Sequence, residues 1–481
     1  LSYEQFKRFH QTYYHPSNAR VVFSGDDAPE RRLEILDEYF SQFDRLDVDA
    51  EVKLQPRWNA PRQVSGTYAG TIDPEKRRDG MVSVNWMLDP PENREETLSH
   101  GMLSYLLAGN SAAPLRKKLN ESGLGEGVIG GGISSYLRQP MGGFGLKGID
   151  PADAEKVEKL VLETLAELAQ SGFSEEQREA AINTFEFNLR EQNTGSYPRG
   201  MTYMFTALGG WLHGGDPLSP LVYEDALSAL KEKAANGHFE KEIRRLFLDN
   251  PHRVTSKIEA DPEQGAREAK AEADRLAAVR AGLSQSELAE VMERTERLRA
   301  LQESVDKPED LARIPTLTLD DLDREIRTVP TAESAIAGVR TLYHDLPTLG
   351  ILYLDLGFDL HVLDKADLPY LPLFGRALLQ TGTSKEDFVS LTQRIGRTTG
   401  GISQHRGLAS MQDGWGTAAW FFLSGKAVAD KFDDMLTIMG DVLLDYSQYG
   451  RKRSVHPFNL TIHKGEVIGV AGLLGSGRTE M

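Results

Sequence analysis

Residues 106–111 read Leu-Leu-Ala-Gly-Asn-Ser, and residues 131–134, beyond a short helical segment, read Gly-Gly-Ile-Ser. The 481-residue chain uses this pattern twice. Residues 378–384 read Leu-Leu-Gln-Thr-Gly-Thr-Ser, and residues 400–403, again beyond a short helical segment, read Gly-Gly-Ile-Ser. The same segments in the same order indicate an internal duplication.

The elements around the two copies also match. Each copy has an apolar strand before it, an apolar strand ending at a glycine after it, and then a long amphipathic helix. These elements are residues 81–88, residues 144–148 and a helix from Pro151 in the first copy, and residues 350–358, residues 420–425 and a helix from Val428 in the second. Strands with hairpin-like returns and amphipathic helices predict an α+β fold, in which each unit is an antiparallel sheet with helices on one face.

The segment between the two units changes composition. Residues 263–304 are rich in Ala, Glu, Arg and Leu. Ser284 and Glu287 form a capping box shortly after Gly282, which predicts an antiparallel helical hairpin joining the two units. A coiled-coil dimer is the alternative, but an apolar seam of two weak turns per arm favours the hairpin.

Composition excludes several classes of protein. A net charge of −17 argues against nucleic-acid binding, which needs a basic face. This acidity suits basic peptides, although solubility alone explains it. No apolar run reaches the roughly 18 residues of a membrane span, and the absence of cysteine excludes disulfides and thiolate metal sites.

Several motifs resemble those of one peptidase family. They are residues 13–19 (Tyr-Tyr-His-Pro-Ser-Asn-Ala), residues 119–125 (Leu-Asn-Glu-Ser-Gly-Leu-Gly), residues 186–191, 198–200 and 211–217, and residues 250–254 (Asn-Pro-His-Arg-Val) before the hairpin. Over about residues 1–445 the chain resembles the pitrilysin or insulinase-type zinc metallopeptidases, most closely the presequence protease branch. The resemblance implies two halves clamped around a peptide-degrading chamber by a helical strap, in a monomeric parent.

The resemblance divides the chain into five segments. They are the end of a first, catalytic domain (1–60, with a strand at Ala19–Ser24), a second peptidase domain (61–262), the hairpin (263–310), a partial third domain (311–448) and a tail (449–481). The chain opens at a helix start, where Ser2 and Gln5 form a capping box, so we expect it to be truncated. We expect a cytoplasmic location.

The zinc site of this family consists of two His from a His-x-x-Glu-His helix and a downstream Glu, with the intervening Glu as general base. None of the eleven His of this chain is followed four residues later by another His. His10, His15, His238, His252 and His361 are expected to be surface or packed residues. The resemblance therefore implies zinc in the intact enzyme but no catalytic residue and no metal ligand in this chain. The expected function is a non-catalytic fragment of a zinc metalloendopeptidase; a non-catalytic peptide-binding or structural subunit is the alternative.

The glycine-rich segments suggest how this chain could contact a peptide. Residues 130–135 and 400–403 leave backbone groups accessible, so an extended peptide could pair there by strand addition. The predicted contacts are Gly131, Gly132, Ile133 and Ser134. The competing explanation, which we favour on sequence alone, is that the glycines permit tight turns and close packing.

Two expectations concern the end of the chain. The third domain, without a partner half, should expose the apolar helix face of Phe432, Met435, Leu436 and Met439. The tail resembles the second nucleotide-binding domain of bacterial sugar-importer ATPases, with a strand at 467–471 followed by a phosphate-binding loop. Its predicted phosphate contacts are Gly472, Gly475, Ser476, Gly477, Arg478 and Thr479.

Arg478 stands in the Lys position of that loop and the chain ends at Met481, so ATP and Mg²⁺ binding is expected only of a complete domain. We interpret the tail as chimeric. An ATP-driven transport subunit is a third hypothesis, which the tail alone supports.

Overall fold

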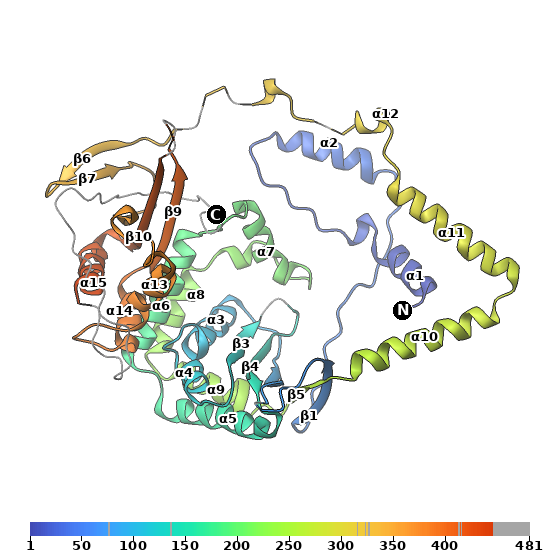
Figure 1. The fold of residues 1–481 in the computed structure, drawn as a ribbon, viewed down its shortest axis with the longest axis horizontal. Helices are drawn as coiled ribbons and strands as arrows, with labels where there is room; N and C mark the ends of the chain where they lie inside the picture. Colours follow the sequence, from blue (N-terminus) through green and yellow to red (C-terminus); the bar gives the residue numbers. More distant parts are fainter. Residues whose placement is uncertain are drawn as a thin grey trace.

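The computed structural model describes residues 1–445 except 76, 135–136, 315, 323, 326–327, 412–413 and 415. The predicted phosphate-binding loop at 472–479 lies outside these residues and stays a prediction. Two sheet-containing units lie at the bottom and the left of Figure 1, and helices α10 and α11 extend to the right, away from both.

The first unit is built on a five-stranded sheet in the order β1-β5-β2-β4-β3. The strands are β1 Arg62–Ala69, β2 Gly80–Met87, β3 Gly127–Ser134, β4 Met141–Ile149 and β5 Arg253–Asp261. All neighbours pair antiparallel except β1 and β5, which are parallel. This order leaves β1 and β3 as the two edges of the sheet.

Helices cover the first sheet and enclose its core. They are α3 Arg94–Ala108, α4 Pro114–Glu121, α5 Ala154–Ser171, α6 Glu175–Glu191, α7 Arg199–Trp211, α8 Glu224–Ala234 and α9 His238–Ile243, which runs into a π-helical turn at Arg244–Leu248. The inward side chains of β2 alternate with half-buried ones, as the sequence pattern predicts. Trp86 packs edge-on against Phe247, with 5.0 Å between ring centroids, and its indole N–H donates to the Phe247 carbonyl at 2.8 Å.

The second unit repeats this topology. Its strands are β8 Ile351–Asp359, β9 Ile402–Ser410 and β10 Thr417–Val428, and its helices are α13 Leu371–Gln380, α14 Phe388–Thr398 and α15 Phe432–Leu444. The antiparallel order β8-β10-β9 corresponds to β2-β4-β3 of the first unit. In both units two helices separate the first two strands and a long helix follows the third. The duplication and the α+β fold are therefore confirmed.

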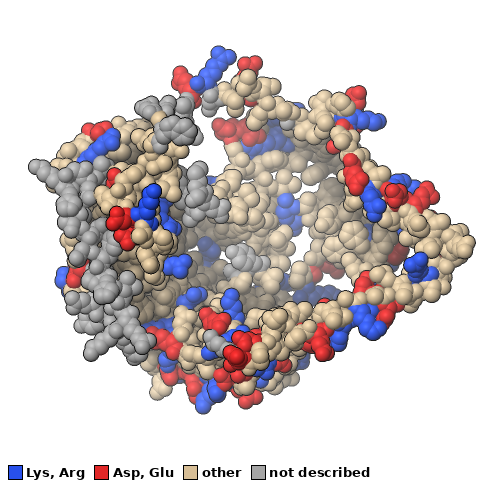
Figure 2. Space-filling model, in the orientation of Figure 1, with Lys and Arg blue, Asp and Glu red and all other residues tan. Residues whose placement is uncertain are grey.

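Residues 264–303 form the predicted hairpin, with α10 at Gln264–Gly282 and α11 at Gln285–Glu303. The Ser284 hydroxyl accepts from the Glu287 N–H, and the Glu287 carboxylate accepts from the Ser284 N–H, so the capping box is confirmed. Neither helix has a buried residue. Figure 2 shows acidic and basic side chains interspersed along this arm rather than gathered into a basic face.

The remaining elements connect these parts. They are helices α1 Tyr3–Tyr13, α2 Pro29–Phe40 and α12 Pro308–Leu311, the hairpin β6 Ala332–Ile336 with β7 Val339–Tyr343, and 3₁₀ turns at Pro16–Asn18, Pro151–Asp153, Ser219–Leu221, Leu319–Asp321, Leu360–Val362, Leu368–Tyr370 and Ala429–Lys431. The capping box of Ser2 and Gln5 is present. Among the described residues, no helix combines the length and apolarity needed to cross a bilayer.

The strand predicted at Ala19–Ser24 is wrong: these residues are extended but belong to no strand. A strand requires a hydrogen-bonded neighbour, and no part of the chain that the structure describes pairs with this segment. No residue from 1 to 60 is buried, so the local apolar pattern has no sheet here on which to act.

The expected exposure of α15 is also wrong for its two methionines. Met435 and Met439 are buried against β10, while Leu436 is 42% exposed. Gly425 of β10 makes this possible, because a Cβ there would lie 2.8 and 2.9 Å from the two sulfur atoms. The helix therefore covers its own sheet.

Candidate functional site

The glycine-rich strand β3 is an open edge with a bulge in it. It pairs with β4 alone. Gly130 lies opposite Phe144 and Gly132 lies opposite Gly143, which leaves Gly131 without a partner in the register. The φ angles of Gly130, Gly131 and Gly132 are +73°, +145° and +141°, values that favour glycine. Bulges of this kind bend an edge strand and end its regular pairing.

A groove of about 640 Å³ lies over this bulge. The glycines of β3 and β4 line it together with Ile133 and Ser134, and Ser104 and Arg116 also border it. The structure therefore places all four predicted contact residues, Gly131 to Ser134, in one groove. Peptide contact there stays a prediction.

Packing requires some of these glycines, as the alternative explanation proposed. A Cβ on Gly132 would lie 2.6 Å from the Cβ of Ser104, and one on Gly130 would lie 2.3 Å from the Gly143 carbonyl oxygen. Gly131 differs, because a Cβ there would meet only Arg116 Nη2, at 3.7 Å. Close packing therefore explains two of the glycines, and Gly131 faces open space.

Two side chains define the polar character of the groove. The Ile133 N–H, which points away from β4, donates to the Ser104 hydroxyl at 2.7 Å, and that hydroxyl donates to the His100 carbonyl at 2.8 Å. Arg116 Nε donates to the Ala108 carbonyl at 2.8 Å, which holds the guanidinium at the groove. The groove thus offers backbone groups of an edge strand beside one fixed cation.

The second copy of the pattern has become an interface. Gly400 packs so closely on Phe187 of α6 that a Cβ would lie 2.1 Å from the ring. Its N–H donates to the Lys426 carbonyl at 2.7 Å. Of the two glycine-rich segments, only the first therefore keeps an open groove.

One face of α6 joins the two units, through Asn183, Phe187 and Glu191 at four-residue steps. The Asn183 amide donates to the carbonyls of Gly396 and Thr399 at 2.8 and 3.0 Å. The Glu191 carboxylate, 3% exposed, accepts from Lys426 Nζ at 2.7 Å and from the Tyr353 hydroxyl at 2.8 Å. Burial, and then the bond to Glu191, raises the pKa of Tyr353.

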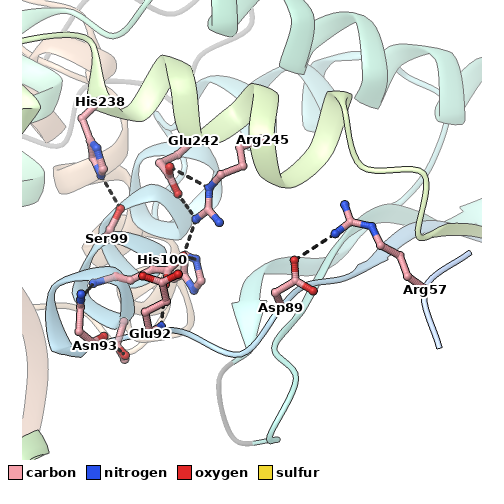
Figure 3. A network of polar contacts seen from close by, with 11 residues as sticks. Arg57, Asp89, Glu92, Asn93, Ser99, His100, His238, Glu242 and Arg245 are labelled. Atoms are coloured by element: carbon pink, nitrogen blue, oxygen red, sulfur yellow. Dashed lines mark hydrogen bonds and ion pairs between the residues drawn. The ribbon is translucent and has the colours of Figure 1, made fainter. Parts of the chain in front are cut away.

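A second polar cluster joins α3 to α9 (Figure 3). Arg245 lies between two carboxylates, with Nη2 at 2.6 Å from Glu96 Oε1 and at 2.6 Å from Glu242 Oε2. His100, 2% exposed, has its Nε2 3.8 Å from Glu96 Oε1. Burial lowers the pKa of His100, and the nearby Glu96 carboxylate opposes this effect.

This cluster does not fit the hydrolytic zinc chemistry of the His-x-x-Glu-His helix. Glu96, Ser99 and His100 stand at the spacing of its three functional positions, so one imidazole is replaced by a carboxylate and the general base by a serine. The Ser99 hydroxyl lies 2.7 Å from His238 Nε2, and it lacks the basicity of a carboxylate. A search for paired His missed this cluster; a carboxylate four residues before a His on one helix is the signal that could have found it.

The other histidines singled out in the sequence lie elsewhere. His10 stacks on Tyr14 with 4.8 Å between ring centroids, and the His15 ring accepts from the Ser17 N–H at 3.2 Å. His252 is buried against Trp58, with 4.7 Å between ring centroids. His361 is exposed, and its Nδ1 lies 2.6 Å from Asp359 Oδ1. His238 is not solitary as expected, because it contacts Ser99.

Two segments match models of one peptidase family. Residues 1–185 match "Peptidase M16 inactive domain", and residues 258–453 match the segment described as associated with subfamily C of the same peptidases. The chain is 40% identical over 450 residues to presequence protease 1, chloroplastic/mitochondrial, of Arabidopsis thaliana, covering 92% of this chain and 42% of that protein. It is 33% identical over 406 residues to protein HypA of Clostridium perfringens, covering 84% of this chain and 41% of that protein.

Among solved structures, pitrilysin superposes with a TM-score of 0.46 at 13% identity, covering 93% of this chain and 44% of that one. The chain thus spans about two fifths of the length of the curated relatives named above.

Proposed function

Because this chain belongs to the M16 peptidase family, we propose that it is a non-catalytic part of a peptidase and binds extended peptides along the edge of β3. The observation that carries this proposal is the groove of about 640 Å³ over the bulge at Gly131. It combines an unpaired strand edge with empty space, which is what an added strand needs.

Strand addition would use the peptide backbone for affinity and alternate side chains for position. The groove floor is glycine at 130–132 and 142–143, so the peptide backbone can approach closely. The Ser104 hydroxyl already occupies the Ile133 N–H, so pairing is expected to centre on the neighbouring bulge. Arg116 can attract a peptide carbonyl or carboxylate at this point.

The substrate class follows from the relatives. The Arabidopsis protein is named a presequence protease, and we extend presequence peptides to this chain as its proposed ligands. A net charge of −17 favours basic peptides over acidic ones.

Peptide-bond hydrolysis is assigned to other parts of the longer protein. The metal-ligand group found among the described residues has one imidazole and no general base beside it. The family zinc would supply a polarised water where two imidazoles, a carboxylate and a base are present. In this proposal the hairpin α10–α11 acts as the strap between the two units.

A non-catalytic subunit that holds peptides without any cutting domain is the alternative function. The matched description "Peptidase M16 inactive domain" for residues 1–185 is the observation that favours it. The gene distinguishes the two, because an intact His-x-x-Glu-His motif encoded upstream supports the peptidase and a degraded motif supports the subunit.

The groove is tested by substitution at both edges of the same sheet. Gly131→Val should fill the groove mouth and weaken binding of a fluorescent presequence peptide at least tenfold. Gly66→Val on the opposite edge strand β1, where a Cβ meets nothing within 4 Å, should leave binding unchanged. Arg116→Gln provides a second groove variant without backbone strain. Wild-type affinity in both groove variants would contradict the proposed site.

A further inference from the structure

The cluster between α3 and α9 contains three groups that bind metals. One oxygen of Glu96, one nitrogen of His100 and one oxygen of Glu242 all lie within 4.8 Å of one another. Glu96 and His100 are one helical turn apart on α3, and Glu242 comes from α9. Two helices that pack in the core of the first unit therefore hold the three groups together.

His100 gives this cluster a meaning that an ion pair does not. Its side chain is 2% exposed, and neither ring nitrogen has a hydrogen-bond partner in the part of the chain that the structure describes. Burying a polar group without a partner costs about 1–3 kcal/mol. The Nε2 atom faces the Glu96 carboxylate at 3.8 Å, too far for a hydrogen bond and close enough for both atoms to share an ion.

We propose that Glu96, His100 and Glu242 form a binding site for a divalent metal of the zinc class. One imidazole and two carboxylates are a donor set that Zn²⁺ accepts, with a fourth position left for water. This site is separate from the peptide groove and does not depend on the proposed function.

Arg245 has to leave for the metal to bind. Its guanidinium now lies between the two carboxylates, where it supplies the positive charge that a metal would supply. The Arg245 side chain is 47% exposed, so it can turn toward solvent. A cavity of about 270 Å³, bordered by Glu96, Glu242 and Arg245, gives an ion access to the carboxylates from outside.

The metal would fasten α3 to α9 rather than cleave peptides. Ser99 stands where the family motif has its general base, so a metal-bound water would have no neighbouring carboxylate in that position. A ligand that binds only the folded state raises the unfolding temperature in proportion to its occupancy.

The test is equilibrium dialysis of the 481-residue chain against ZnCl₂, with Zn²⁺ counted per chain. His100→Asn and Glu242→Gln should each remove one equivalent of bound zinc. His361→Asn, which alters an exposed His beside Asp359, should not remove it. Equal zinc content in wild type, His100→Asn and Glu242→Gln would overturn the site.

Arg245→Met keeps the test decisive if the ligand variants fold poorly. A metal site predicts about tenfold tighter zinc binding in Arg245→Met, because the competing cation is gone, together with a visible spectrum of tetrahedral Co²⁺ after substitution. A purely structural ion network predicts that Arg245→Met binds no metal, and this result would also overturn the proposal.

Discussion

Glu191 of α6 and Lys426 of β10 are 235 residues apart in sequence, and their charged groups lie 2.7 Å apart at the junction of the two units. The carboxylate is almost fully buried and has the Tyr353 hydroxyl as its other partner. A sheet strand of the second unit is thus tied directly to a helix of the first. This contact, more than chain connectivity, defines how the duplicated units pack.

Replacing Lys426 should weaken the junction. Lys426→Met leaves the Glu191 carboxylate buried with only a hydroxyl partner, which should lower the free energy of unfolding by about 3 kcal/mol. Urea titration and limited proteolysis of residues 330–445 measure the effect. Lys385→Met is the matched control, because Lys385 is 71% exposed in its pair with Asp441 and should change stability by less than about 0.5 kcal/mol. An equal, small effect of both variants would show that the junction does not depend on this ion pair.

Gly400→Ala tests the close packing of the second glycine pair. The new Cβ would collide with the Phe187 ring, so we expect a loss of about 1–3 kcal/mol in unfolding free energy. Gly440→Ala on α15 is the control, since a Cβ there meets nothing within 4 Å and should stabilise the helix by about 0.5–1 kcal/mol. Denaturant midpoints of the two variants should therefore move in opposite directions.

Asp79 should make the first unit sensitive to acid. The Arg77 guanidinium, bonded to it through Nε and Nη2, holds the pKa of this buried carboxyl below its ordinary value of 3.8. A depressed carboxyl pKa stabilises the fold fully above 3.8, and this stability is lost as the pH falls through the folded value. Asp79→Asn should therefore unfold at lower urea than wild type at pH 7, and the difference should shrink below about pH 4. A difference that stays constant to pH 3 would contradict this role for the charge.

The chain should show no peptidase activity of its own. With added ZnCl₂ and a fluorogenic presequence peptide, we expect no turnover above the buffer rate, because Ser99 replaces the general base beside the one metal-ligand cluster found in the described residues. Turnover that a chelator abolishes and Glu242→Gln removes would assign catalysis to this cluster.

Much of the fold is predictable from local pattern. The alternation from Val82 to Leu88 and the capping boxes at Ser174 and Ser284 locate elements whose apolar faces are completed within each unit. The strand expected at 19–24 is absent because pairing depends on a distant partner. Met435 and Met439 are buried because Gly425 admits their sulfur atoms, which no helical pattern reveals.

The sites follow the same rule. The Gly-Gly-Ile-Ser repeat locates both glycine-rich strands, but sequence alone does not show that the first faces open space and the second faces Phe187. The cluster of Glu96, His100 and Glu242 joins residues 146 positions apart (242 − 96). Its third member becomes visible only when α9 packs on α3.

The central claim, that β3 receives a peptide as an added strand, is tested most directly by the peptide itself. Affinity of the wild-type chain is measured by fluorescence anisotropy for one presequence peptide and for its fully backbone N-methylated form, which keeps every side chain and loses its amide donors. Strand addition predicts that the N-methylated peptide binds at least tenfold more weakly. Equal affinity for the two peptides would show that side chains alone are recognised and would contradict the claim.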